Sequence, residues 1–167
     1  GTAIAGCTDA RLDRLVGMFV GTVVLRTAVD PARPFTDLLR DVRTTDLGAL
    51  AHADVPFDEV VARLAPRRDP SYSPLFQVLL THRVEAGEVL PQLPDVQIAE
   101  TDAGEPAAQF DVVIELVEHE AGLDLRLVYA TDLFDDTTGD AMLTDLVAML
   151  AAALAEPDRA VGDLAVP

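Results

Sequence analysis

The residues able to perform acid–base or metal chemistry are few and scattered in this sequence. Its histidines are His52, His82 and His119, and no two of them have the spacing of metal ligands on one helix face. None has a neighbour in sequence that would make it a catalytic base, so each is interpreted as a structural residue. The sequence therefore predicts no catalytic residue and no metal ligand of its own.

Nucleophilic chemistry has equally little support. Cys7 is the single cysteine, which excludes an intrachain disulfide and a cysteine-based zinc cluster and fits a reducing, cytoplasmic setting. The chain has no lysine, so Schiff-base formation and a phosphate-binding loop lysine are excluded. The carboxylates of Asp132, Asp135 and Asp136 are interpreted as the acidic start of a helix.

Charge and hydropathy exclude several classes of binding protein. The 12 basic and 29 acidic residues give a net charge of −17, which disfavours binding to nucleic acid and to anionic membrane surfaces. No apolar run reaches the roughly 20 residues that span a bilayer, since the longest, Met142–Leu154, is interrupted by Thr144 and Asp145. No signal peptide is visible. We therefore expect a soluble protein of the cytoplasm, with no nucleic acid or membrane partner.

Hydrophobic periodicity shows which elements must position these residues. It predicts helices over about 34–51, 57–64 and 137–154, and a short helix after Thr8 or Asp9 that carries Leu12, Leu15 and Val16. It predicts strands over 1–6, over 18–29 as a central strand apolar on both faces, over 75–84, and over 110–118 and 123–130 as a hairpin around Ala121 and Gly122. The predicted fold class is α/β or α+β, a mixed sheet with flanking helices.

One connection is unusually long. Residues 86–108 are acidic, are rich in proline and glycine, and hold a single short strand candidate, Val96–Ala99. A connection of this length inside one domain is usually functional or crosses to another part of the molecule.

Four segments resemble the late conserved motifs of one family, in the same order and with matching gaps. They are VGMFVGTVVLR (16–26), HADVPFDEVV (52–61), RRDPSYSPLFQVLL (67–80) and YATDLFD (129–135). These segments are similar to motifs of the condensation domains of nonribosomal peptide synthetases. The segments GTAIAGCTD at the start and AVGDL near the end also resemble that family. The resemblance runs the whole length of the chain.

The resemblance implies a fold and an activity. Condensation domains are similar in fold to chloramphenicol acetyltransferase, with two lobes and a tunnel between them. They join a donor acyl or peptidyl thioester to an acceptor aminoacyl amine, both carried on phosphopantetheine arms. The family's HHxxxDG motif lies in the N-terminal lobe, and this chain has no His-His pair. Residues 1–167 are then expected to be a C-terminal lobe portion, inactive alone, in which 86–108 reaches over to the absent lobe.

The resemblance also implies site residues and partners. Six residues are expected along the substrate tunnel: Phe19, Gly21, Thr22, Ser71, Ser73 and Gln77. The chain departs from the family at Gly21, where Asn is usual, and at Cys7, where Arg is usual. The expected partners are the N-terminal lobe, peptidyl carrier proteins and an adjacent adenylation domain, together with self-association through exposed apolar surface. No cofactor is expected to bind directly, since phosphopantetheine arrives on the carrier proteins.

Two further functions remain open. The chain could belong to a non-catalytic module of the same superfamily that recruits a carrier protein or an adjacent domain. It could also be part of a coenzyme A-dependent acyltransferase. An intact HHxxxDG motif upstream would favour the condensation enzyme of antibiotic and other secondary metabolism, and a degenerate motif would favour the recruitment module.

Overall fold

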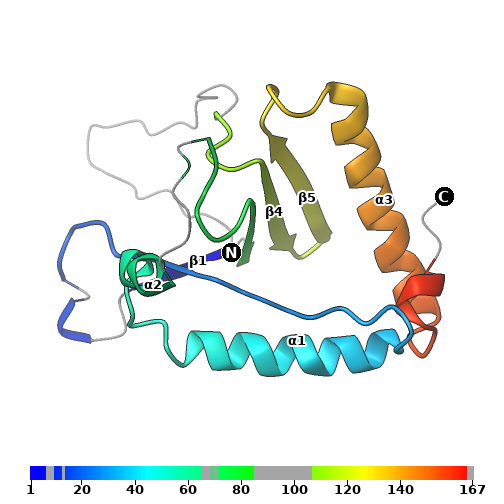
Figure 1. Ribbon diagram of the computed structural model, residues 1–167, viewed down its shortest axis with the longest axis horizontal. Coiled ribbons are helices and arrows are strands. Elements are labelled where there is room, and N and C mark those ends of the chain that lie inside the picture. The colour runs from blue at the N-terminus through cyan, green and yellow to red at the C-terminus, as the bar shows by residue number, and fades with distance from the viewer. Residues whose placement is uncertain (7–9, 13, 65–68, 70, 85–106, 165–167) are drawn as a thin grey trace.

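The structure is a computed structural model that describes residues 1–6, 10–12, 14–64, 69, 71–84 and 107–164. Its strands are β1 Thr2–Ala5, β2 Val20–Val23, β3 Val78–Val84, β4 Val112–His119 and β5 Gly122–Tyr129. Its helices are α1 Phe35–Leu50, α2 Phe57–Leu64 and α3 Asp136–Ala155, with 3-10 turns at Ala10–Leu12 and Val161–Asp163. In Figure 1, α1 lies below the sheet and α3 stands beside β5.

The strands form one mixed sheet in the order β2-β1-β3-β4-β5. The central strand β3 runs parallel to β1 and β4, whereas the edge strands β2 and β5 run antiparallel to their neighbours. The β3–β4 pairing extends from Val78↔Val112 to Val84↔Glu118, but β1 meets β3 only at Thr2↔Leu80. A mixed sheet with flanking helices confirms the predicted fold class.

The helices begin and end close to the predicted bounds because local signals encode them. Pro34 precedes α1 with φ −55°, the value that its ring imposes and that suits a helix start. Asp135 caps α3, since its Oδ1 accepts a hydrogen bond of 2.8 Å from the backbone N–H of Thr138. The helix predicted over 57–64 is α2.

The hairpin is confirmed, with its turn shifted by one residue. His119 pairs with Gly122, so Glu120 and Ala121 form the two-residue turn and Gly122 begins β5. Gly122 has φ +152°, a conformation that residues with a Cβ rarely adopt, which explains why glycine stands there.

Two predicted elements differ from the structure. The strand predicted over 18–29 is only Val20–Val23, and it is an edge strand, not a central one. Helix α2 packs against β2, which accounts for apolar residues on one of its faces, and Val20 is exposed. The short helix near the start is a 3-10 turn, Ala10–Leu12, and it leaves Leu15 and Val16 exposed.

Backbone hydrogen bonds join the start of α1 to the segment that follows α3. Phe35 N donates to Arg159 O at 3.0 Å, and Val161 N donates to Arg33 O at 2.9 Å. Pro34 and Ala160 form an isolated bridge between these segments. The AVGDL segment therefore ties the end of α3 to the start of α1.

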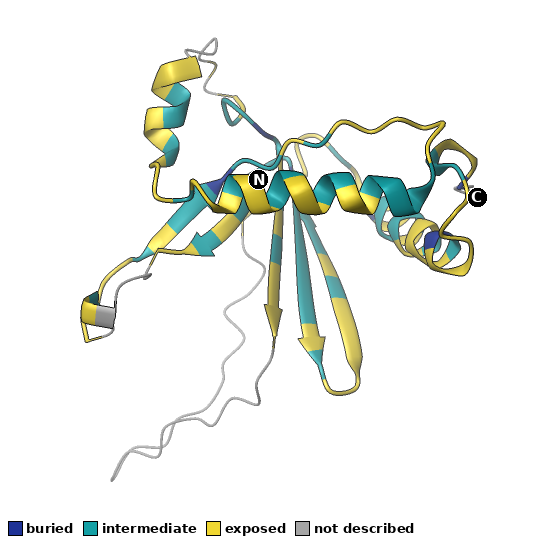
Figure 2. Cartoon of the chain, turned by 90° about the horizontal axis from the view of Figure 1, so that it is seen from below, coloured by how far each residue is buried: buried dark blue, intermediate teal, exposed yellow. Residues whose placement is uncertain are grey.

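The buried core is small. Among the described residues, the buried apolar residues are Val23, Phe76, Val112, Ala153 and Leu164. The Phe76 ring stacks on Phe110, with centroids 5.0 Å apart, and meets Phe57 edge-on at 5.8 Å. Most of the chain in Figure 2 is exposed or half-buried.

Helix α3 is long and apolar enough, by length and composition alone, to cross a membrane. It has 20 residues, and its most apolar stretch has a mean hydropathy of 1.4. The apolar run predicted from the sequence is shorter than this helix, because the run begins at Met142. Asp140 and Asp145 lie within the helix, and carboxylates are costly in hydrocarbon. Gly139 is buried against the Tyr129 ring of β5, so α3 is a helix that packs on the sheet.

The predicted crossing segment over 86–108 lies almost wholly outside the described residues, of which only 107 and 108 belong to it. The strand candidate Val96–Ala99 lies outside them as well, as do Cys7, Thr8 and Asp9.

Candidate functional site

The six predicted tunnel residues fall into two groups in the structure. Phe19, Gly21 and Thr22 lie on or next to β2, at one edge of the sheet. Ser71, Ser73 and Gln77 lie in the segment that leads into the central strand β3, and β1 separates the two groups.

The β2 group does not present all its side chains on one face. Gly21 pairs with Ile4 and Thr22 pairs with Ala3, so these neighbours point to opposite faces of the sheet. Phe19 O accepts a hydrogen bond of 2.6 Å from Gly6 N, which joins the approach to β2 to the end of β1.

Thr22 lines a small cavity between β2, the end of α1 and α2. This cavity has a volume of about 220 Å³, and His52, Phe57 and Val60 also line it. The His52 Nδ1 lies 2.9 Å from Gly48 O. Because a carbonyl oxygen can only accept, His52 Nδ1 donates this bond. The bond fixes the ring to the last turn of α1, in agreement with a structural role.

Ser71 and Ser73 line a larger cavity, which we name the Ser73 cavity. It has a volume of about 640 Å³ and lies between residues 71–73, the segment that enters β4 and the segment that follows β5. Its polar lining consists of Ser71, Tyr72, Ser73, Gln109, Asp111 and Asp132. Sequence reasoning found the two serines but missed the carboxylates, because their approach to the serines depends on the pairing of distant strands.

Hydrogen bonds shape the loop that borders the Ser73 cavity. Asp69 Oδ1 accepts a hydrogen bond of 2.5 Å from the Ser71 hydroxyl and one of 2.9 Å from the Ser71 backbone N–H. These bonds hold the pKa of Asp69 below its ordinary value, and the bond from the hydroxyl has the larger effect. Gln77 Nε2 donates to Ser73 O at 2.9 Å. Ser71 and Gln77 thus hold the loop in shape, and Ser73 faces the cavity.

The charge around the Ser73 cavity restricts what it can accept. Asp111 and Asp132 line it, and Asp69 lies beside Ser71 at its edge. Carboxylates attract ammonium groups and repel phosphate. The cavity therefore suits an amine or a neutral group that donates hydrogen bonds.

Each of the other histidines contacts a carboxylate. His82 Nε2 lies 3.3 Å from Glu118 Oε2, and His119 Nε2 lies 3.1 Å from Asp124 Oδ2. In the part of the chain that the structure describes, no group of three His, Cys, Asp or Glu side chains could hold a metal.

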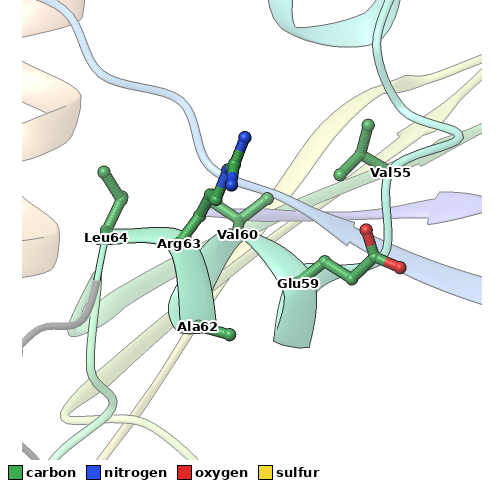
Figure 3. A pocket seen from close by; sticks show the side chains of 6 residues that line it. All are labelled: Val55, Glu59, Val60, Ala62, Arg63 and Leu64. Atoms are coloured by element: carbon green, nitrogen blue, oxygen red, sulfur yellow. The ribbon is translucent and has the colours of Figure 1, made fainter.

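A third hollow lies on α2 and was not predicted. It has a volume of about 650 Å³, and it is lined by Val55 and, along α2, by Glu59, Val60, Ala62, Arg63 and Leu64. Figure 3 shows these side chains spread around a single helix and the turn before it. The hollow is an open surface feature, and its lining holds no pair of groups suited to acid–base catalysis.

The whole chain matches proteins of nonribosomal peptide synthesis. The profile of the condensation domain family matches residues 1–167. One of the linear gramicidin synthase proteins of Brevibacillus parabrevis is 37% identical over 174 residues, which cover 99% of this chain and 2% of that protein. The dimodular nonribosomal peptide synthase of Bacillus subtilis (strain 168) is 35% identical over 170 residues, which cover 98% of this chain and 7% of that protein. The chain thus spans only a few per cent of these relatives.

Solved structures of similar proteins share the fold. The X-domain from teicoplanin biosynthesis has a TM-score of 0.90 and 28% identity, over 99% of this chain and 38% of that chain. A four-domain nonribosomal peptide synthetase bound to AMP and glycine has a TM-score of 0.87 and 26% identity, over 99% of this chain and 14% of that chain. The first condensation domain of the CDA synthetase shares the fold, with a TM-score of 0.73 and 18% identity.

Proposed function

Because this chain belongs to the condensation domain family, we propose that it acts as the C-terminal lobe portion of a domain that forms peptide bonds between carrier-bound thioesters. The match over residues 1–167 to that family carries the proposal. The chain covers 38% of the X-domain chain and has no His-His pair, which supports a lobe portion that works with an N-terminal lobe.

The proposed reaction joins two carrier-bound substrates. The acceptor amine nitrogen attacks the donor thioester carbonyl, a C–N bond forms, the C–S bond breaks, and the amine's proton leaves as the donor carrier's thiol is released. The base that takes this proton would belong to the N-terminal lobe, since the sequence of this chain lacks the His-His motif. The partners would be carrier proteins with phosphopantetheine arms and an adjacent adenylation domain, acting in the cytoplasm.

The Ser73 cavity would serve the uncharged or cationic part of a substrate. Its carboxylates disfavour the phosphate of the arm, whereas the arm's amide groups could donate to Asp111 and accept from Gln109. An acceptor amine in its ammonium form would be attracted by Asp132. Phe19, Gly21 and Thr22 would form a second, separate wall of the tunnel.

The activity of the intact domain tests this function. The domain encoded by the parent gene would be supplied with both carrier-bound substrates, and dipeptidyl thioester would be followed by mass spectrometry. We expect turnover in the intact domain, and Asp132→Asn should raise the KM for the acceptor about 2- to 5-fold, the effect of one exposed charge pair. Asp140→Asn, on the exposed side of α3, is the control and should leave KM unchanged.

A recruitment module is the second candidate. The X-domain, which has a TM-score of 0.89 with this chain, was solved in a complex with OxyB, so a related domain binds another protein. Binding of a partner protein by the intact domain, with no dipeptidyl thioester formed, would support this candidate against the first. A degenerate HHxxxDG motif upstream in the parent gene would point the same way.

A further inference from the structure

The small cavity beside Thr22 brings two polar side chains together in an otherwise apolar space. We name it the Thr22 cavity; it has a volume of about 220 Å³ and lies between β2, the end of α1 and α2. Apart from Thr22 and His52, its lining residues are valines, an alanine and Phe57. No Asp, Glu or Arg of the described residues lines it. An apolar cavity with a few convergent polar groups is the usual form of a site for a small ligand.

The polar atoms of the Thr22 cavity are a ring nitrogen and a hydroxyl. His52 Nδ1 donates to Gly48 O at 2.9 Å, so Nε2 of the neutral ring is an acceptor, whereas the Thr22 hydroxyl can donate and accept. Neither Nε2 nor this hydroxyl has a partner within the part of the chain that the structure describes. Thr22 is half-buried and His52 is exposed, so His52 stands on the open side of the cavity.

The volume of the Thr22 cavity suits a ring-sized group. An apolar cavity of about 150 Å³ takes up benzene, so this cavity has room for a ring that carries a hydroxyl. Water alone is a poorer occupant, since most of the wall offers no hydrogen bond and a buried water needs about two to four polar partners. A charged group is disfavoured as well, because it would lose its hydration without meeting an opposite charge.

The cavity can be reached from the side of α2. Val55 and Val60 line both the Thr22 cavity and the hollow on α2 that Figure 3 shows, so the two spaces adjoin. Val55 lies in the turn before α2 and is 41% exposed. A ligand can therefore enter beside Val55 while the sheet stays intact.

We propose that the Thr22 cavity receives the side chain of a carrier-bound substrate, and that this side chain is neutral and ring-sized and carries a hydrogen-bond donor such as the O–H of a phenol. The O–H donates to His52 Nε2, and its oxygen accepts from the Thr22 hydroxyl. This inference rests on the proposed function and deepens it by naming a substrate class. The carboxylate-lined Ser73 cavity and the uncharged Thr22 cavity then accept chemically different groups.

Phenol and benzene test the cavity without turnover. Each would be titrated into the intact domain encoded by the parent gene, with the valine methyl signals followed by NMR. We expect both to shift the Val60 signals, and we expect Thr22→Val to lower the ratio of phenol affinity to benzene affinity about 2- to 10-fold, the effect of one hydrogen bond. Thr44→Val is the control and should leave this ratio unchanged, because Thr44 is exposed on α1 and its hydroxyl donates to Arg40 O.

Filling the cavity is a second test. Val60→Phe should weaken the binding of phenol and of benzene at least 10-fold. Val147→Phe adds the same ring at an exposed valine of α3, and it should weaken neither. If Val60→Phe prevents folding, Thr22→Val, which keeps the shape of the side chain, decides the outcome.

Turnover identifies the carrier that brings the side chain. Tyrosyl and phenylalanyl groups would be supplied to the intact domain, first on the acceptor carrier and then on the donor carrier, and dipeptidyl thioester would be followed by mass spectrometry. Thr22→Val should raise the KM for the tyrosyl group relative to the phenylalanyl group about 2- to 10-fold at one of the two positions. Thr44→Val should change the ratio at neither.

Valine signals that do not move with phenol or benzene would overturn the inference, as would a phenol-to-benzene ratio that is the same in the parent and in Thr22→Val. An unchanged tyrosyl-to-phenylalanyl KM ratio at both positions would overturn the assignment to a substrate side chain. Phenol binding of the expected kind without any dipeptidyl thioester contradicts the condensation function and not the cavity. Turnover without phenol binding contradicts the cavity and not the function.

Discussion

At the scale of single residues, Phe76 joins segments that are far apart in the sequence. Its ring stacks on Phe110, next to β4, and meets Phe57 of α2 edge-on. It also lies so close to Gly1 that a Cβ there would overlap the ring. Aromatic rings dominate the energetics of small cores, so Phe76 is the residue whose loss should cost this fold most.

Gly21 is the residue where a larger side chain should be tolerated. A Cβ at this position would lie 3.3 Å from Ile4 Cγ1 and 3.5 Å from Ile4 Cδ1, and these are side-chain atoms that can shift slightly. We expect Gly21→Asn to change the melting temperature little, with a small gain from restricting the unfolded chain. Thermal unfolding of the variant beside the parent chain measures this.

Phe76→Ala is the contrast for Gly21→Asn, with an expected loss of about 3–5 kcal/mol. If Gly21→Asn destabilised the chain as much as Phe76→Ala, Gly21 would be packed in a closed core. The assignment of Phe19, Gly21 and Thr22 to a tunnel wall would then be wrong.

At the scale of elements, α3 depends on the carboxylates at its start. Hydrogen bonds from Thr138 and then from Thr137 hold the pKa of Asp135 below its ordinary value of 3.8. The next residue, Asp136, accepts a hydrogen bond of 3.0 Å from the Tyr129 hydroxyl and thereby raises the pKa of Tyr129. The interpretation of an acidic helix start is confirmed for Asp135 and Asp136, whereas Asp132 precedes the helix and lines the Ser73 cavity.

The cap makes part of the stability of α3 depend on pH. The pKa of Asp135 is lower in the folded chain than its ordinary value of 3.8. The stabilisation that its carboxylate gives the fold is therefore complete above pH 3.8, and it is lost as the pH falls through the lower pKa of the folded chain. We expect Asp135→Ala to lower the melting temperature by about 2–4 °C at pH 7. The difference from the parent should shrink in acid, and circular dichroism melts across pH measure it.

Asp140→Ala is the matched control for the cap, because Asp140 is an exposed acid of the same helix. It should lower the melting temperature less than Asp135→Ala at pH 7. A deficit of the Asp135 variant that stayed constant down to the lowest pH at which the chain is folded would show that its carboxylate is not the cap.

At the scale of the whole molecule, the chain has many exposed apolar side chains and few buried ones. The described residues include exposed leucines and valines on α1, β3 and α3, whereas the buried apolar set is limited to Val23, Phe76, Val112, Ala153 and Leu164. This balance is what we expect of the proposed lobe portion, and the chain spans only part of the length of its relatives.

The 167-residue chain alone should have no condensation activity. The sequence lacks the His-His motif, and His52, the histidine that lines the smaller cavity, is held by Gly48 O through Nδ1. With both carrier-bound substrates supplied, dipeptidyl thioester should form no faster than in the absence of the chain. Turnover above that spontaneous rate, followed by mass spectrometry, would contradict the lobe-portion assignment.

The sequence alone determined most of the elements and the family. Helices α1 and α2, the cap at Asp135 and the hairpin were predictable because periodicity, capping and turn residues act over a few neighbouring positions. Only the tertiary structure placed β2 at the edge, separated the six predicted tunnel residues into two groups and brought Asp111 and Asp132 to Ser73. These features depend on pairings such as Thr2↔Leu80 and Val78↔Val112, which join residues too distant in sequence for any local pattern to encode.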